Sequence, residues 1–486
     1  MFKISKLSLV ILTISLFNYE AKEPRMITIP LKVIRNSPGK YPISKYQNIT
    51  IEKEEEVKTI FGKKIRKLKE VIHGEISILE CTLFALPITI SNDQNFNVVL
   101  DTGSAALWVP KTGSNDSCKI DHHYDPSKST TGSLTTETFE IRYGTGATKG
   151  YYYTDYIKFV VDNSYSMKFG AADQTDFDVT GADGIMGLAK KYNSNQYSPI
   201  WTLQSKDRIP NKSFSFKFIK EKEMVEMYLG DEHEDFLDKN NIAQCQLLHE
   251  TTYDNLLWTC KLYSFGLITN NGSSNSTVSC GFNFLFDTGS NVMILPKKIM
   301  DQLFQNFNDE LKEYNCYNYL ESPKNYRIYC EGKYHEHSEE VELPDLFIEV
   351  GDHYLILDHE EMYYYSRIED SGINKDIYLL NVIFEEDITI SLIGQPFFRM
   401  FHTKFDPENK VLKFYSEKKG SIIYSSEKPD DDKADSFEPM GSNWWNEKTI
   451  KMIAAFGVVI AAFLVLICFC KCCKKIFCKK VKSSAI

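Results

Sequence analysis

The chain has 486 residues, of which 43% are hydrophobic and 13% aromatic, so most of it should be globular rather than disordered. This length leaves room for two lobes of roughly 170–180 residues and further segments. The net charge of −10 is unevenly spread: residues 24–72 and 447–486 each carry about seven net positive charges, leaving about −25 for the body between them. So acidic a body argues against a nucleic-acid partner.

Residues 1–21 have the pattern of a secretory signal peptide. Lys3 and Lys6 precede an apolar run from Leu7 to Phe17, and small or polar residues follow. Such a segment is removed on entry to the secretory pathway. The next segment, residues 22–73, is rich in lysine and arginine.

From about Glu75 to Tyr424 the sequence predicts an all-β body. Short β-branched and aromatic runs, separated by Gly, Asn and Asp, recur about every 8–15 residues, as in a mostly antiparallel protein. Three short segments have helical character: Ser198–Lys206, Lys297–Glu313 and Glu360–Ile368.

The C-terminal part predicts a membrane anchor. The acidic residues 425–447 indicate a solvated stalk, and the uncharged run inside residues 448–471 is long enough to span a bilayer as a helix. Trp444 and Trp445 precede this helix and lysines follow it, so residues 472–486 should be a cytosolic tail. We therefore expect a single-pass type I protein of the secretory pathway, in the plasma membrane or in an endolysosomal or vacuolar membrane.

The cysteines and sequons fit this topology. Five of the twelve cysteines lie at the inner membrane edge, and the sequence leaves open whether they are palmitoylated or are simply reduced thiols. The other seven are expected to face an oxidising compartment, where disulfides persist. Because seven is odd, at least one of them is free or paired outside the chain. The candidate glycosylation sites are Asn48, Asn115, Asn211, Asn271 and Asn275.

One internal repeat carries the chemistry. The run Asn97–Ser104 ends in Asp101-Thr102-Gly103-Ser104, and a similar run ends in Asp287-Thr288-Gly289-Ser290. Each copy has an apolar strand before it and another apolar run after it. The second copy follows the first by 186 positions. A repeat at this spacing in an all-β body predicts two related lobes facing each other across a cleft.

If the two loops meet, Asp101 and Asp287 form a dyad. Two carboxylates a few ångströms apart cannot both ionise cheaply, so the pair holds one proton over a wide pH range. One aspartate can then take a proton from a bridging water while the other donates to a scissile carbonyl oxygen. Thr102 and Thr288 can lock the loops together, and Ser104 and Ser290 can hold the outer carboxylate oxygens.

Over nearly all of residues 74–424 the chain resembles the pepsin family of aspartic peptidases. Besides the two aspartate loops, the motifs that carry the likeness are Leu107–Pro110, Tyr124–Ser127, Ile141–Gly146, Asp183–Leu188, Leu343–Leu346, Leu392–Arg399 and Phe405-Asp406. The resemblance implies a bilobal fold with lobes at 74–245 and 246–424, polypeptide substrates, no cofactor or metal, and a monomer.

The resemblance also implies a mobile flap over the cleft. Tyr143 would be the flap tyrosine, its hydroxyl reaching toward Trp108, while Gly144 and Thr145 belong to the same flap. In the second lobe Cys316 and Cys330 match the family's disulfide. Cys81 is a candidate partner for Cys118, and Cys245, Cys260 and Cys280 leave more than one pairing open.

Departures from the family pattern concern the loops' neighbours. Ala105 and Ala106 replace a usual polar pair, and Asn291 replaces a small residue, so we expect altered specificity or pH profile rather than loss of activity. Residues 22–73 resemble a pepsin-type propeptide, whose positive charge would hold the acidic cleft shut near neutral pH. Two histidine pairs are candidate metal ligands: His122-His123 and His335-x-His337. The flanking segments offer no third and fourth ligands at the spacing of a zinc site, so we expect surface histidines.

These features predict an aspartic endopeptidase made as a zymogen. A glycosidase could also use two carboxylates, but it needs neither repeated Asp-Thr-Gly-Ser loops nor a flap between them. The remaining alternative is a catalytically silent, membrane-anchored binding protein on the same fold.

Overall fold

The computed structural model describes part of the chain. The described residues are 27–35, 51–52, 58–60, 63–65, 71–72, 82–116, 120–144, 146–160, 163–176, 181–190, 198–220, 224–230, 241–268, 275–310, 315–322, 324–333, 343–370, 373–386, 388 and 390–425. The predicted signal peptide, stalk, membrane helix and tail lie outside them, as does most of the predicted propeptide. Among the described residues, no helix is long and apolar enough to cross a membrane.

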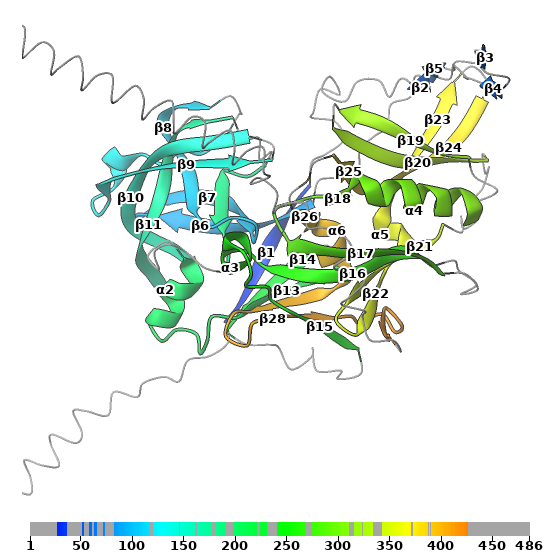
Figure 1. The fold of residues 1–486 in the computed structure, drawn as a ribbon. Coiled ribbons are helices and arrows are strands. Elements are labelled where there is room, and N and C mark those ends of the chain that lie inside the picture. The colour runs from blue at the N-terminus through cyan, green and yellow to red at the C-terminus, as the bar shows by residue number, and fades with distance from the viewer. Residues whose placement is uncertain are drawn as a thin grey trace, which may run out of the picture. The chain divides into compact units, whose positions relative to one another are not determined.

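The described part is mostly β-strand with few helices, which confirms the predicted all-β class (Figure 1). The larger of its two main sheets has 13 strands among these residues. In sheet order they are β15 (Ile242–Gln246), β28 (Val411–Tyr415), β27 (His402–Asp406), β13 (Phe214–Ile219), β14 (Met224–Leu229), β1 (Ile27–Arg35), β6 (Thr82–Ile90), β7 (Gln94–Asp101), β12 (Gly184–Gly187), β8 (Leu107–Asp116), β11 (Asn163–Thr175), β10 (Gly146–Val160) and β9 (Ser133–Tyr143).

The second sheet has 12 strands among the described residues and is built from the later part of the chain. In sheet order they are β23 (Tyr363–Asp370), β24 (Ile373–Leu380), β20 (Asn325–Lys333), β25 (Val382–Glu385), β18 (Met293–Pro296), β26 (Ser391–Ile393), β17 (Asn275–Phe286), β16 (Thr259–Ile268), β21 (Asp345–Val350), β22 (His353–Leu357) and β29 (Ile422–Tyr424), with β19 (Asn315–Ser322) paired to β20. Two small two-stranded sheets pair β2 (Ile51–Glu52) with β5 (Val71–Ile72) and β3 (Lys58–Ile60) with β4 (Lys63–Ile65).

The helices agree with two of the three predicted segments. α2 (Pro199–Ser205) begins after Ser198, whose side chain accepts a hydrogen bond from the Trp201 amide, and α4 is Lys297–Glu310. The third prediction was largely wrong: α5 (His359–Met362) is one turn long, and β23 follows at once. Aromatic Tyr363–Tyr365 favours a strand, and pairing with β24 overrides the helical spacing. The other helices among the described residues are short α3 (Thr252–Leu256), α6 (Gln395–Met400) and the 3₁₀ turn η2 (Pro126–Lys128).

The internal repeat is also a repeat of topology. β7 pairs in parallel with β12, and β17 pairs in parallel with β26. In the first half the Leu188 amide donates to the Asp101 carbonyl at 2.7 Å, and in the second the Asp287 amide donates to the Ile393 carbonyl at 2.9 Å. Each aspartate loop therefore begins beside a short segment of two apolar residues and a glycine, Ile185–Gly187 in the first half and Leu392–Gly394 in the second. Hydrogen bonds to this segment hold the backbone at the start of the loop.

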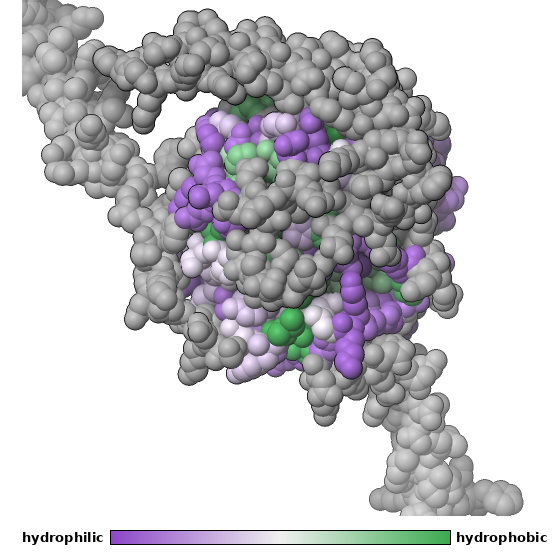
Figure 2. Space-filling model, turned by 90° about the vertical axis from the view of Figure 1, so that its right-hand side faces the viewer, coloured by the Kyte–Doolittle hydropathy of each residue, from purple (hydrophilic) through white to green (hydrophobic). Residues whose placement is uncertain are grey.

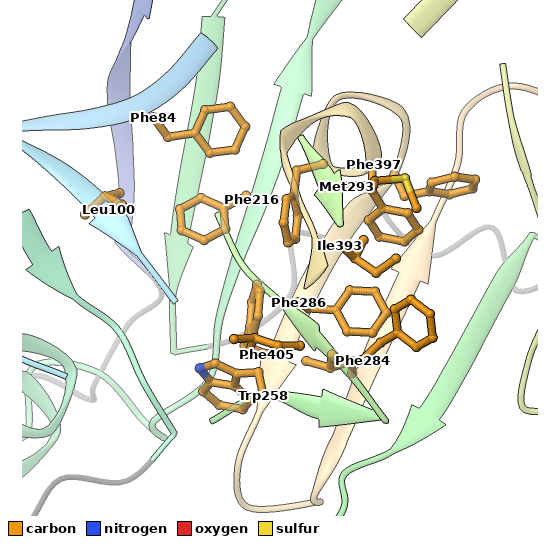
Figure 3. Close-up of a cluster of buried hydrophobic side chains, with 14 of the residues drawn as sticks. Phe84, Leu100, Phe216, Trp258, Phe284, Phe286, Met293, Ile393, Phe397 and Phe405 are labelled. Atoms are coloured by element: carbon orange, nitrogen blue, oxygen red, sulfur yellow. The ribbon is translucent and has the colours of Figure 1, made fainter. Parts of the chain in front are cut away.

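Aromatic side chains fill the core behind the loops (Figure 3). Phe405 stacks on Phe214 with ring centroids 4.8 Å apart and meets the edge of Trp258 at 5.1 Å. The three residues come from β27, β13 and the segment before β16, so this cluster joins distant parts of the chain. On the face shown in Figure 2 the described surface is mainly hydrophilic, with scattered apolar residues, as expected for a globular protein in water.

Strand β1, from the predicted propeptide, belongs to the larger sheet. Its residues 27–31 pair with β14 and residues 32–35 pair with β6, both antiparallel. The strand is therefore interior in the sheet, with a neighbour on each side.

Candidate active site

The structure brings the two aspartate loops into direct contact. A Cβ added to Gly103 would lie 2.7 Å from Asp287 Cγ, and one added to Gly289 would lie 2.5 Å from Asp101 Oδ1. Real Cβ atoms do not approach this closely, so each loop needs its glycine because the opposite aspartate packs on it. The close approach of the two loops thus explains why a glycine stands at each position.

The loops are tied by four reciprocal hydrogen bonds. The Thr102 amide donates to Thr288 Oγ1 at 3.1 Å, and the Thr288 amide donates to Thr102 Oγ1 at 3.0 Å. Each hydroxyl in turn donates across the interface, Thr102 Oγ1 to the Phe286 carbonyl and Thr288 Oγ1 to the Leu100 carbonyl, both at 2.7 Å. Both threonines are fully buried, so these bonds have no competing water.

Each carboxyl also accepts a hydrogen bond from its own loop. The Gly103 amide donates to Asp101 Oδ1 at 2.9 Å, and the Gly289 amide donates to Asp287 Oδ1 at 2.8 Å. Loss of hydration raises the pKa of Asp101, and hydrogen bonds partly offset this rise. The pKa of Asp287 is raised well above its ordinary value by loss of hydration first and by the charge of Asp101 second. Burial therefore favours a state in which the two carboxyls share one proton.

The serines of the two loops behave differently from each other and from the prediction. Ser104 lies close enough to Asp101 to lower its pKa, but its buried hydroxyl makes no well-directed hydrogen bond among the described residues. Ser290 Oγ donates to the Val292 carbonyl at 2.9 Å. Because the single hydroxyl proton of Ser290 goes to a carbonyl of its own loop, the prediction that Ser290 holds an outer carboxylate oxygen was wrong.

The predicted flap is the hairpin between β9 and β10. Tyr143 pairs with Gly146 at its tip, and Thr145 lies outside the described residues. The Tyr143 hydroxyl accepts a hydrogen bond from Trp108 Nε1 at 2.8 Å. Burial, and then the charge of Asp101, raises the Tyr143 pKa, so the hydroxyl stays protonated beside the dyad. A Cβ at Gly144 would meet nothing within 4 Å, which leaves the tip open.

The disulfides partly correct the predictions. Cys316 pairs with Cys330, in agreement with the resemblance. Cys260 pairs with Cys245, one of the pairings that the sequence left open, and Cys280, also a disulfide candidate, is buried and free. β15 of the larger sheet contacts β16 of the second sheet and so brings Cys245 to Cys260, which sequence spacing could not show.

Only some of the remaining predicted cysteines and glycosylation sites belong to the described residues. Cys81, Cys118, Asn48 and Asn271 lie outside the described residues, and of Asn275 only the backbone is described. Asn115 is exposed.

Asn211 is half-buried. Its Oδ1 accepts hydrogen bonds from the Ser213 amide at 2.9 Å and from the Ser213 hydroxyl.

One described cluster has metal-ligating groups that the sequence did not single out. Ligand atoms of Asp345, Asp358 and His359 lie within 4.8 Å of one another. His359 Nδ1 already contacts Asp345 Oδ1 at 2.8 Å, and Lys418 pairs with Asp358. The two carboxylates therefore already pair with His359 and with the ammonium group of Lys418.

Sequence reasoning missed two residues that support the loops. Trp258 Nε1 donates to the Leu188 carbonyl at 2.7 Å, directly after the strand that supports Asp101. Gln395 Nε2 donates to the Thr288 carbonyl at 2.5 Å. Gln395 directly follows Leu392–Gly394, the segment that pairs beside the Asp287 loop. This position in the sequence could have marked Gln395 as a residue that supports the loop.

Comparison with known proteins places this site in a family. The sequence profile of the eukaryotic aspartyl proteases matches residues 84–416, and the chain belongs to that family. It is 36% identical to a chymosin of Callithrix jacchus over 124 residues, 25% of this chain and 32% of that protein. It is 26% identical to a gastricsin of Mus musculus over 235 residues, 46% and 57% of the two chains. With a plasmepsin I of Plasmodium falciparum it shares 25% identity over 342 residues, 68% and 67% of the two chains. The chain thus spans only about a third of the matched chymosin and just over half of the gastricsin.

Proposed function

We propose that the protein is an aspartic endopeptidase in which Asp101 and Asp287 share one catalytic water. The observation that carries the proposal is the meeting of two carboxyls from matched loops, locked by reciprocal threonine hydrogen bonds. A binding protein has no need of a dyad whose two pKa values are both raised.

In the proposed reaction the carboxyls exchange protons with water and substrate. Ionised Asp101 takes a proton from the water as its oxygen attacks the scissile carbonyl carbon, and Asp287 donates its proton to the carbonyl oxygen. When the tetrahedral intermediate collapses, the C–N bond breaks and the leaving nitrogen takes the proton held by Asp101. As the new carboxyl group forms, one hydroxyl of the intermediate returns its proton to Asp287, so that Asp101 is again ionised and Asp287 again protonated.

Polypeptides are the proposed substrates, bound beneath the hairpin that carries Tyr143. Its contact with Trp108 fixes the hydroxyl over the dyad when the flap is closed. The family preference for apolar side chains on both sides of the cut bond is proposed here as well. We propose that the enzyme acts as a monomer.

We also propose that the chain is made as a zymogen. Supporting this, β1 of the predicted propeptide is an interior strand of the larger sheet, so the uncleaved chain incorporates the segment into its fold. N-terminal sequencing after acid incubation tests this: a cut between about residue 36 and the first lobe is expected, and unchanged length with full activity would contradict it.

Entry into the secretory pathway, the type I anchor and glycosylation remain proposals that rest on the sequence. Exposed Asn115 is the sequon for which the described residues offer the best access.

The test of function is cleavage of a quenched apolar peptide by the acid-treated full chain from about pH 3 to about pH 7. Asp287→Ala is assayed beside it, with and without pepstatin. We expect acid-optimal cleavage that pepstatin blocks and the variant lacks. No cleavage at any pH by a folded chain whose propeptide has been removed would overturn the proposal and favour a binding protein.

A further inference from the structure

Gln395, the first residue of α6, contacts the Asp287 loop through both its side chain and its backbone. It is 1% exposed, and its Nε2 donates to the Thr288 carbonyl at 2.5 Å. Its backbone amide donates to the Ser290 carbonyl at 2.8 Å. Of the two side-chain atoms only the amide nitrogen can donate to a carbonyl, so the orientation of the amide is determined.

The accepting carbonyl belongs to the peptide that holds the Asp287 carboxyl. The Thr288 carbonyl and the Gly289 N–H are the two ends of one peptide unit, and that N–H donates to Asp287 Oδ1 at 2.8 Å. A donor on the carbonyl polarises the peptide and strengthens the hydrogen bond at its other end. The Gln395 amide is therefore connected to the carboxyl through a single peptide.

Among the described residues, no side chain gives the Asp101 loop such a connection. There the Ala189 amide donates to the Ser104 carbonyl at 2.9 Å, the same backbone contact that Gln395 makes to Ser290. The Ala189 side chain has no donor. The two loops therefore have the same backbone support, and a side-chain amide stands at one of them only.

Gln395 is held firmly in this place. A Cβ on Gly394 would collide with the Val292 carbonyl, so the chain packs tightly against the loop just before Gln395. One turn into α6, Phe397 is fully buried and meets Phe286 edge to face at 5.4 Å (Figure 3). Phe286 directly precedes Asp287, so α6 and the catalytic loop are braced against each other.

We propose that Gln395 is a positioning residue: its side-chain amide orients the Thr288–Gly289 peptide and thereby holds the Asp287 carboxyl in its reactive place. This inference rests on the proposed peptidase function. Because the amide does not titrate, it gives this support at every pH. A glutamate at the same place would give it only while protonated, since an ionised carboxylate cannot donate and would repel both the carbonyl and Asp287.

Charged groups near α6 are shared by wild type and variants. Asp101 and Asp287 lie on the loops, and on α6 itself Arg399 pairs with Glu361 of α5 at 2.8 Å. The neighbouring elements α5, β13 and β27 further carry His359, Glu360, Lys217, His402, Lys404 and Asp406. The difference between two pH profiles therefore isolates position 395.

The test compares Gln395→Met, of similar volume but without a donor, with Gln395→Glu in the full acid-treated chain. We expect Gln395→Met to lower kcat about threefold to tenfold at all pH values with KM unchanged, because the side chain does not touch substrate. Gln395→Glu should match the wild type near pH 4 and fall below Gln395→Met near pH 6. The matched control, exposed Gln246→Glu, adds the same charge elsewhere and should leave the profile unchanged.

Three results would overturn the proposal. One is wild-type kcat and pH profile in both folded variants, and another is an equal loss in both at every pH, as a purely structural role predicts. If one variant does not fold, the other carries the test, and failure of both to fold at acid pH makes Gln395 a folding residue. An active wild type with an inactive Asp287→Ala separates these results from failure of the peptidase proposal itself, which would show as a wild type that does not cleave.

Discussion

The two Asp-Thr-Gly-Ser loops are nearly identical in sequence and backbone contacts, yet their carboxyls differ. Each threonine hydroxyl accepts a hydrogen bond from an amide of the opposite loop. Each also donates a hydrogen bond to a carbonyl oxygen on the opposite side, 2.7 Å from its Oγ1. Loss of hydration raises the pKa of both carboxyls, and the further causes then differ, because the charge of Asp101 adds to the rise for Asp287. Part of the reason is local, since Ser104 stabilises the charge of Asp101 whereas Ser290 turns to the Val292 carbonyl.

This comparison teaches that a symmetric frame can hold an asymmetric acid pair. The reciprocal threonines set where the carboxyls stand, and this requires only that the two loops match. The neighbours that do not match, Ser104 against Ser290 and Ala189 against Gln395, give the two carboxyls unlike surroundings. In the proposed reaction we expect the division into acid and base to come from these neighbours rather than from the repeat itself.

The largest expected effect comes from removing either carboxyl. Asp101→Asn and Asp287→Asn should each lower kcat/KM at least about a thousandfold, because neither acid works without its partner. Peptide cleavage across the acid range measures this. If one variant kept more than a tenth of wild-type activity, the dyad would not act as a unit.

The next effect comes from crowding the contact between the loops. Gly103→Ala and Gly289→Ala should each lower activity about a hundredfold with little change in thermal stability, because the clashing atoms are carboxylate atoms that can swing aside. Activity and the unfolding midpoint, measured on the same preparation, test this. Normal activity in either variant would show that the loops are further apart than described.

Removing a threonine hydroxyl tests the symmetry directly. Thr102→Val leaves the Thr288 amide and the Phe286 carbonyl without their partner, so unfolding free energy should fall by about 2–4 kcal/mol. Thr288→Val should cost the same because its distances are the same within 0.1 Å. Thr→Ser at each position keeps the hydroxyl and is the control. Clearly unequal costs, measured by denaturant unfolding, would contradict the symmetric frame.

The smallest effect concerns stability against pH. Because the pKa of Asp287 is raised in the folded state, the native protein binds more protons than the unfolded chain above the ordinary aspartate range. Its stabilising contribution is present in acid and is lost as pH rises through the folded pKa, by about 1.4 kcal/mol for each tenfold change in proton affinity. Asp287→Asn should flatten this decline between about pH 4 and about pH 7. Thermal unfolding at both pH values measures it, and an unchanged decline would show that Asp287 is not the raised group.

The sequence by itself determined the chemistry and the class. Asp, Thr, Gly and Ser in two matched contexts predict a dyad, and alternating apolar runs predict the β-rich body. Such signals are local: each is contained in a few neighbouring residues whose types limit what they can do.

Only the tertiary structure decided which distant groups meet. Cys260 pairs with Cys245 rather than with Cys280 because β15 of the larger sheet contacts β16 of the second sheet. Gln395 reaches Thr288 across 107 positions of the chain because β26 pairs with β17 and aromatic packing braces α6 there. Contacts of this kind depend on the register of strands far apart in sequence, and no single segment of the chain encodes that register.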